Sequence, residues 1–211
     1  SNPVNADYDV SEDAVYIVDS GNNRILVYDV QGGISDGMAA TYVMGQSNMT
    51  SASAAVTQSG LSGPIAIEIA DSLDSVVTTF DPVLTVRRTL WVADASANRL
   101  LLYRFTTLAN LASPNAYQVI GQQDTVVTPM GTTPIFTGSS AFSGDDGPND
   151  LSFSTNKKMV VDTNNHRLFV QDRTANRVLI FNLDADNELR DRVADNVIGQ
   201  SDFTSAGASP T

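Results

Sequence analysis

Three segments of this chain repeat one pattern, and the repeat restricts the fold more than any other feature. Each segment has a short β-rich run, a polar turn that contains Asn-Arg, and a second β-rich run. The three segments are residues 15–28, 90–103 and 168–181. Two apolar runs around a polar turn predict a β-hairpin. The fold must therefore use one small unit three times.

Two further markers accompany each hairpin. An apolar strand that ends in Asp precedes it, at Asp9, Asp71 and Asp162. A Gly-Gln sequence follows it, at Gly45, Gly121 and Gly199. The interval from this Asp to this Gly is 36, 50 and 37 residues. The excess lies between Asp71 and Asp94, which are 23 residues apart where the other units have 10, so we expect a 13-residue insertion.

Each unit thus holds four short strands in about 40–45 residues, which is typical of one blade of a β-propeller. The predicted fold class is all-β, with three four-stranded blades in a single propeller unit that spans residues 1–211. The blades cover about 3–46, 61–122 (with the insertion at 72–84) and 148–200. Ser- and Thr-rich linkers cover 47–60, 123–147 and 201–211.

The pattern apolar-x-apolar-x-Asp, then Asn-Arg-apolar-x-apolar-aromatic, resembles the NHL repeat. Residues 197–205 are also similar to the linker of bacterial NHL-repeat proteins. This resemblance implies a propeller that serves as a scaffold, an RNA binder or, in some cases, an enzyme. It implies six blades, so either two copies form a homodimer ring or the other blades belong to a longer chain. By analogy with exported bacterial propellers, we expect an extracellular or periplasmic location.

Composition excludes several functions. The 12 Lys and Arg residues against 24 Asp and Glu residues give a net charge of −12, which disfavours nucleic acid as a partner. With no Cys and one His, disulfides, thiolate metal sites and the usual zinc chemistry are excluded. No apolar run approaches the roughly 20 residues of a membrane span, so membrane insertion is not expected.

Residue types that recur in every unit are expected to be structural. The Asp–Arg pairs are close enough across each turn for a charge-assisted hydrogen bond: Asp19–Arg24, Asp94–Arg99 and Asp172–Arg177. The aromatic residues Tyr16, Trp91 and Phe169 are expected to pack between blades. His166 occupies the turn position of Asp13 and is expected to be solvated.

No cofactor is predicted, and calcium is the one metal that the sequence leaves open. Weak candidate ligands are Asp145 and Asp146 in one acidic loop, Asp184 and Asp186 in another, and Glu68 inside an apolar strand. Solvated turns are the ordinary explanation for the two loops. Glu68 could join Asp7, Asp9 and Asp162 on a propeller axis.

The sequence therefore favours a non-catalytic binding scaffold that presents interblade loops to a protein, peptide or glycan partner. A calcium-dependent propeller hydrolase or lyase is the alternative. Linkers longer than about 12–15 residues and the insertion are the expected recognition surfaces. Residues 83–86 should lengthen the hairpin that follows and project beyond the blade edge. Deleting 13 residues there should leave a folded unit.

Overall fold

The computed structural model describes residues 2–78, 81–112, 114–121, 124–128, 131–134, 136–137, 158–173 and 175–207, the side chains of 71–87 and 124–134 aside. The strands of these residues form three four-stranded antiparallel sheets and one separate hairpin. Helix is confined, in these ranges, to three short 3-10 segments: η1 (Ser20–Asn22), η2 (Ala95–Ala97) and η3 (Leu108–Ala112). The predicted all-β class and its three four-stranded units are confirmed.

In every sheet, the strands lie side by side in the order of the sequence. The first sheet contains β1 (Pro3–Asp9), β2 (Ala14–Asp19), β3 (Arg24–Asp29) and β4 (Tyr42–Met44). The second contains β5 (Pro64–Thr78), β6 (Asp81–Asp94), β7 (Arg99–Phe105) and β8 (Gln118–Ile120). The third contains β11 (Met159–Asp162), β12 (Arg167–Asp172), β13 (Arg177–Asn182) and β14 (Asn196–Ile198).

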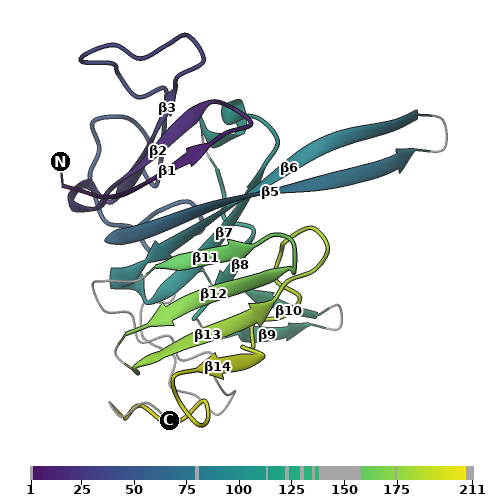
Figure 1. Cartoon of the computed structure of the whole chain (residues 1–211). Helices are drawn as coiled ribbons and strands as arrows, with labels where there is room; N and C mark the ends of the chain where they lie inside the picture. The colour runs from purple at the N-terminus through teal and green to yellow at the C-terminus, as the bar shows by residue number, and fades with distance from the viewer. Residues whose placement is uncertain are drawn as a thin grey trace.

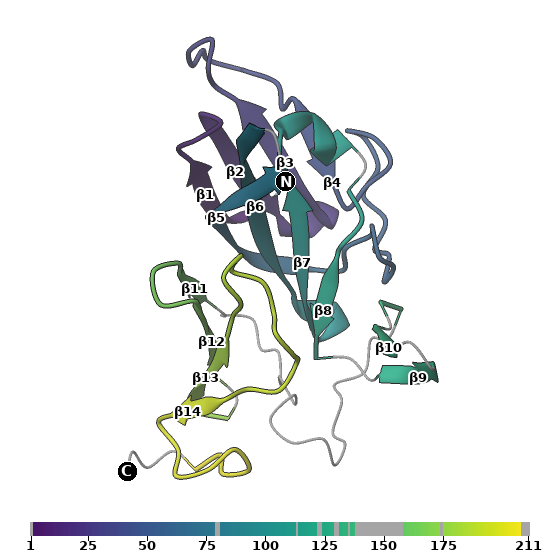
Figure 2. The ribbon, with the colours of Figure 1, turned by 90° about the vertical axis from the view of Figure 1, so that its right-hand side faces the viewer.

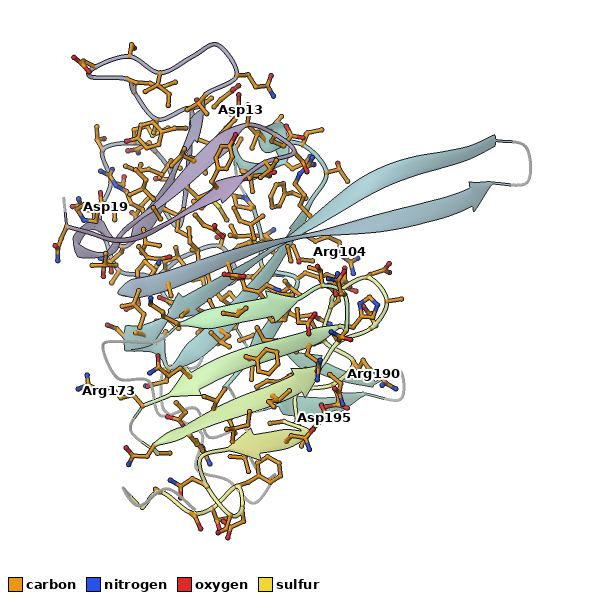
Figure 3. The ribbon with its side chains drawn as sticks, viewed as in Figure 1. Asp13, Asp19, Arg104, Arg173, Arg190 and Asp195 are labelled. Carbon is orange, nitrogen blue, oxygen red and sulfur yellow. The ribbon has the colours of Figure 1, made fainter. Side chains whose placement is uncertain are left out.

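The second sheet lies between the other two (Figures 1 and 2). The first strands of the three sheets are neighbours, because side chains of β1 bind the backbone of β5 and a side chain of β5 binds the backbone of β11. Figure 3 shows Arg104 at the boundary between the second and third sheets, where it forms an ion pair with Glu188 and stacks 3.7 Å from the ring centre of Tyr117.

Two hydrophobic cores fill the spaces between the sheets, and they use equivalent positions. The core between the first and second sheets includes Tyr16, Val18, Ile25, Val27 and Met44 from the first sheet and Leu90, Val92, Leu101, Tyr103 and Val119 from the second. The core between the second and third includes Trp91, Ala93, Leu100, Leu102 and Ile120 from the second and Leu168, Val170, Leu179, Phe181 and Val197 from the third. Alternation along each strand thus gives every sheet two apolar faces. The predicted packing of Tyr16 and Trp91 between sheets is confirmed.

The inserted residues form a hairpin arm, described over residues 71–78 and 81–88, which continues β5 and β6 away from the second sheet (Figure 1). Residues 83–86 pair with β5, whereas β6 pairs with β7 only from Arg88 onward. The arm therefore projects as predicted. However, the hairpin that it lengthens is the one formed by β5 and β6, and not the following hairpin of β6 and β7.

The register also corrects the predicted place and length of the insertion. Asp9 faces Ala14, Asp162 faces Arg167, and the equivalent pair of the second sheet is Ala70 and Thr89. Asp71 is therefore not a repeat position but the first residue of the arm. Eighteen residues connect the pair in the second sheet and four connect it in the others, so the insertion has 14 residues.

The second linker contains structure that the sequence analysis did not predict. Residues 124–134 include a two-stranded hairpin, β9 (Asp124–Thr128) with β10 (Gly131–Pro134). Most of the remaining linker lies outside the described residues. Within the described ranges, none of the helical segments has the length and apolar character required to cross a membrane.

We expect a shortened arm to leave the fold intact. Deleting residues 73–76 together with 83–86 removes four facing pairs, keeps the alternation of faces and keeps the turn. The described members of both cores lie outside these segments. The variant should match the wild type in circular dichroism and in the midpoint of thermal unfolding. A large loss of cooperativity would show that the arm belongs to the core.

Candidate functional site

One end of each sheet is closed by an Asp–Arg pair. Asp is the last residue of the second strand and Arg the first of the third, so the two residues face each other across the turn. The distance from Arg Nε to Asp Oδ2 is 2.8 Å for Asp19–Arg24, 2.8 Å for Asp94–Arg99 and 2.9 Å for Asp172–Arg177. The predicted contact across the turn is present in all three sheets.

The Asn before each Arg makes the turn possible. Asn23, Asn98 and Asn176 have φ values of 52°, 49° and 51°, in the left-handed region that Asn tolerates better than most residues. The Gly of the Gly-Gln marker packs on this turn. Gly121 has a φ of 88°, and a Cβ there would lie 2.7 Å from the carbonyl oxygen of Asn98. A side chain at this position would therefore collide with the backbone of the turn.

Each Arg also binds the linker that leaves its own sheet. The Nη1 groups of Arg24 and Arg177 donate to the carbonyl oxygens of Met49 and Phe203, each four residues after the marker Gly. Arg99 donates to Phe136, which lies 15 residues after its marker Gly because the hairpin of β9 and β10 intervenes. We call each Asp, Arg and linker carbonyl an Asp–Arg clamp.

Linker 47–60 is held from both of the sheets that it connects. Gln46 donates to the carbonyl oxygen of Ser53, and Gln58 donates to that of Ala116 in the second sheet. Arg99 donates to the carbonyl oxygens of Thr57 and Gly60. Backbone acceptors used in this way favour a structural role for this linker, which the sequence analysis expected to be a recognition surface.

Burial distinguishes the three clamps. Asp94 and Arg99 have no exposed side-chain surface, whereas Arg24 is 15% exposed. Burial raises the pKa of Asp94 to about 6, although Arg99 and the backbone N–H of Ser62 oppose it. Burial acts in the same direction on Asp19, but hydrogen bonds from Asn22 and Arg24 outweigh it and lower the pKa of Asp19. The carboxylate of Asp94 therefore depends more on its Arg partner to stay ionised than the carboxylate of Asp19 does.

The acidic loops are turns wherever the structure describes them. Asp184 Oδ1 accepts hydrogen bonds from the backbone N–H groups of Asp186 and Glu188, which stabilises the turn. Asp145 and Asp146 lie outside the described residues. No group of three or more metal-binding side chains occurs in the part of the chain that the structure describes.

His166 keeps the predicted turn position but is not simply solvated. Its φ of 53° matches the 48° of Asp13 at the equivalent position. The ring is half-buried, and Nδ1 lies 2.8 Å from Oδ1 of Asn187. The loop between β13 and β14 therefore covers the one histidine of the chain.

A pocket of about 310 Å³ lies at the opposite end of the sheets from the clamps. It is lined by the end of β1 with the residue after it, by the base of the arm and by the end of β11: Tyr8, Asp9, Val10, Ile69, Ala70, Val161 and Thr163. In Figure 3, Asp13 and Asp19 mark these two ends of the first sheet. The pocket thus draws on all three sheets.

Asp9 and Arg88 fix the base of the arm beside the pocket. Asp9 Oδ1 accepts hydrogen bonds from the backbone N–H groups of Ser11 and Glu12, which stabilises the turn after β1. Its Oδ2 lies 3.2 Å from Arg88 Nε, and Arg88 Nη1 lies 3.0 Å from Glu12 Oε1. The side chains of Asp9 and Arg88 are almost completely buried, so the base of the arm is held in place.

The pocket rim is apolar and aromatic. Val10 is 79% exposed and Tyr8 is 48% exposed. The hydroxyl of Tyr8 donates to Asp13 Oδ1 over 2.8 Å, and this hydrogen bond raises the pKa of Tyr8. A fixed tyrosine beside an exposed valine provides contact area at a small entropic cost.

The proposed axial carboxylates bind backbone and are not assembled around a common point. Asp7 Oδ2 accepts the N–H of Ile69 over 2.9 Å, and Glu68 Oε1 accepts the N–H of Val161 over 3.3 Å. Asp162 stabilises its own turn by accepting from Asn165. Burial raises the pKa of Glu68; the Val161 N–H opposes this, and the charge of Asp7 adds to it.

The chain matches no protein-family model, and no curated protein matches it. The site is therefore interpreted from its own geometry. The sequence patterns did not single out Arg88 as a residue of the site. Its position in the repeat could have identified it. Arg88 occupies the position held by Asp13 and His166 in the other sheets, and Asp9 at the end of β1 lies beside it.

We expect the central clamp to contribute most to stability. Arg99→Met removes one partner of a buried ion pair, which costs about 3–5 kcal/mol. Arg24→Met should cost less, because Asp19 can regain water. Urea unfolding measures both free energies. Adding Asp94→Asn to Arg99→Met should recover part of the loss, and equal losses for the two single variants would contradict this ranking.

Glu68→Gln should raise stability at neutral pH. Burial raises the pKa of Glu68 above its ordinary value of 4.5, so its ionisation opposes folding as the pH rises through the raised value. Gln keeps an acceptor for Val161 and does not ionise. The melting temperature of the variant should exceed that of the wild type at pH 7, and the difference should close at pH 4. Asp36→Asn, which changes an exposed carboxyl, controls for net charge; a difference independent of pH would refute the argument.

Proposed function

We propose that this chain is a non-catalytic binding scaffold, an NHL-type β-propeller unit whose recognition surface is the pocket together with the hairpin arm. The partner is a basic polypeptide segment in extended conformation. One observation carries the proposal: the arm interrupts only one of three otherwise equivalent sheets, and it rises beside the pocket.

The argument rests on departure from a repeat. Clamps, turns and core positions recur in the sheets, so folding accounts for them. The arm has no counterpart at residues 10–13 or 163–166, where four residues complete the same connection. A segment that the fold does not require is the best candidate for a segment that function requires.

The backbone of the arm favours an extended polypeptide. Residues 81–87 pair with β5 alone, and among the described strands nothing pairs with the outer edges of the arm. Free strand edges bind extended segments by main-chain hydrogen bonds. A glycan could stack on Tyr8 but would not use these edges.

Charge supports a basic partner. The chain has a net charge of −12, and such an excess attracts cationic segments at long range. Beside the pocket, Tyr8 and Val10 offer apolar contacts at which such a segment could be anchored.

The propeller arrangement, its six-bladed ring and an extracellular or periplasmic location belong to this proposal. The propeller arrangement is supported by three equivalent sheets packed face to face. The location rests on the resemblance to exported bacterial propellers alone. The ring would be completed by a second copy or by further blades of a longer chain.

The alternative is a calcium-dependent hydrolase or lyase. It is favoured by one observation, the equivalent positions of Asp7 and Glu68 on neighbouring first strands. A calorimetric titration distinguishes the two: micromolar calcium binding that Glu68→Gln abolishes would favour the enzyme, and no heat up to millimolar calcium would remove it.

The binding proposal can be tested with peptides selected from a random displayed library on the full chain. We expect selected peptides to be basic and apolar, and to lose at least tenfold in affinity for the variant that lacks residues 73–76 and 83–86. Asp36→Asn, on the loop between β3 and β4, should leave the affinity unchanged. Equal affinity for the arm-shortened variant and the wild type would place recognition elsewhere.

A further inference from the structure

The first and third sheets each have one largely apolar face that is less buried than its equivalents elsewhere in the molecule, although Val43 and Ile180 within these faces are only 8% exposed. We define the leading face of the first sheet as Val15, Ile17, Leu26, Tyr28 and Val43. We define the trailing face of the third sheet as Phe169, Gln171, Val178, Ile180 and Ile198. Strand register places both sets at the positions that form the two existing cores.

The leading face repeats the faces by which the second and third sheets pack on their predecessors. The equivalent residues of the second sheet are at most 1% exposed: Leu90, Val92, Leu101, Tyr103 and Val119. In the first sheet, Val15, Ile17, Leu26 and Tyr28 are only half-buried. An apolar face with this arrangement lacks the neighbour that its equivalents have.

The trailing face repeats the faces that receive a following sheet. Tyr16 and Trp91 are fully buried, while Phe169 at the same position is half-buried. Met44 and Ile120 are also fully buried, while Ile198 is 54% exposed. Val160, which faces Phe169 in the register, is 55% exposed and extends this surface.

The loop before the last strand of a sheet also contributes to its contact with the preceding sheet. In the second sheet, Leu111 of this loop is buried against the first sheet, in the core that includes Tyr42. In the third, Leu189 is buried against the second sheet and exchanges two hydrogen bonds with Gln118. In the first sheet, Ile34 of the same loop is 81% exposed.

The described part of the linker after the third sheet, residues 201–207, makes the same hydrogen bonds as the start of the linker after the first. Gln46 donates to Asn23 and Ser53, and Gln200 donates to Asn176 and Gly207; Ser53 and Gly207 each lie seven residues after the Gln. Asn23 and Asn176 donate to the equivalent carbonyl oxygens of Ala52 and Ala206. The third sheet therefore presents its trailing face with the same flanking structure as a sheet that already has a follower.

We infer that the trailing face binds the leading face of a second copy of this chain, with Ile34 packing beside it. The inference rests on the propeller arrangement of the proposed function. Because each copy carries both faces, two copies form two identical head-to-tail contacts and leave neither face open. The occupant is a second copy because this chain carries apolar residues at all the equivalent positions of both faces except Gln171, where the other sheets have Val18 and Ala93.

The test measures molar mass by light scattering during gel filtration of the full chain. The wild type should have about twice the 22.5 kDa mass of one chain. Ile198→Asp and Ile34→Asp should each give a folded species of one chain mass, because each places a charge in the contact. Met49→Asp adds the same charge to an exposed apolar residue of linker 47–60 and should leave the dimer intact.

A wild type that runs at one chain mass, or as an open series of larger species, would overturn the inference. So would dimers of both face variants. Circular dichroism confirms that the variants are folded. Binding of the selected peptides is measured on the same samples, so a failed interface and a failed peptide site give different results.

Discussion

The buried Asp–Arg pair of each turn is the contact on which the arrangement of this molecule depends. An isolated two-stranded hairpin is marginal in water, and three sheets joined by long linkers could pack in many ways. The guanidinium group fixes both the hairpin and the linker. Its Nε donates to the Asp across the turn, and its Nη1 donates to a carbonyl oxygen of the linker that leaves the sheet. Arg is suited to this double role, since lysine lacks the planar, forked set of donors.

The two ends of the sheets have separate tasks as a result. The end with the clamps carries the linkers, whose acceptors are occupied by side chains of the sheets they connect. The other end carries the connections between first and second strands, the loops between third and fourth strands, the arm and the pocket. Arg88 connects the first and second sheets at this end, since it packs the base of the arm against Asp9 and Glu12.

The sequence predicted much of the fold because the determining contacts are local. Asp19 and Arg24 are five residues apart, and the Asn turn between them is readable from residue type alone. Glu68 was harder, since its acceptor role depends on Val161, 93 residues away. The misplacement of Asp71 has a similar cause: a strand that continues into an arm has no turn to mark the repeat position. The hairpin of β9 and β10 was missed because its Thr- and Val-rich strands are short and lie within a linker.

The connection between the first and second strands is a tolerant insertion point. Register on either side of the arm is the same as in sheets whose connection has four residues. Pairing with β7 ends at Arg88, and the arm residues beyond Arg88 pair only with each other. Arms of different sequence could be transplanted onto residues 10–13 or 163–166, so new binding surfaces can be acquired without redesign of the fold.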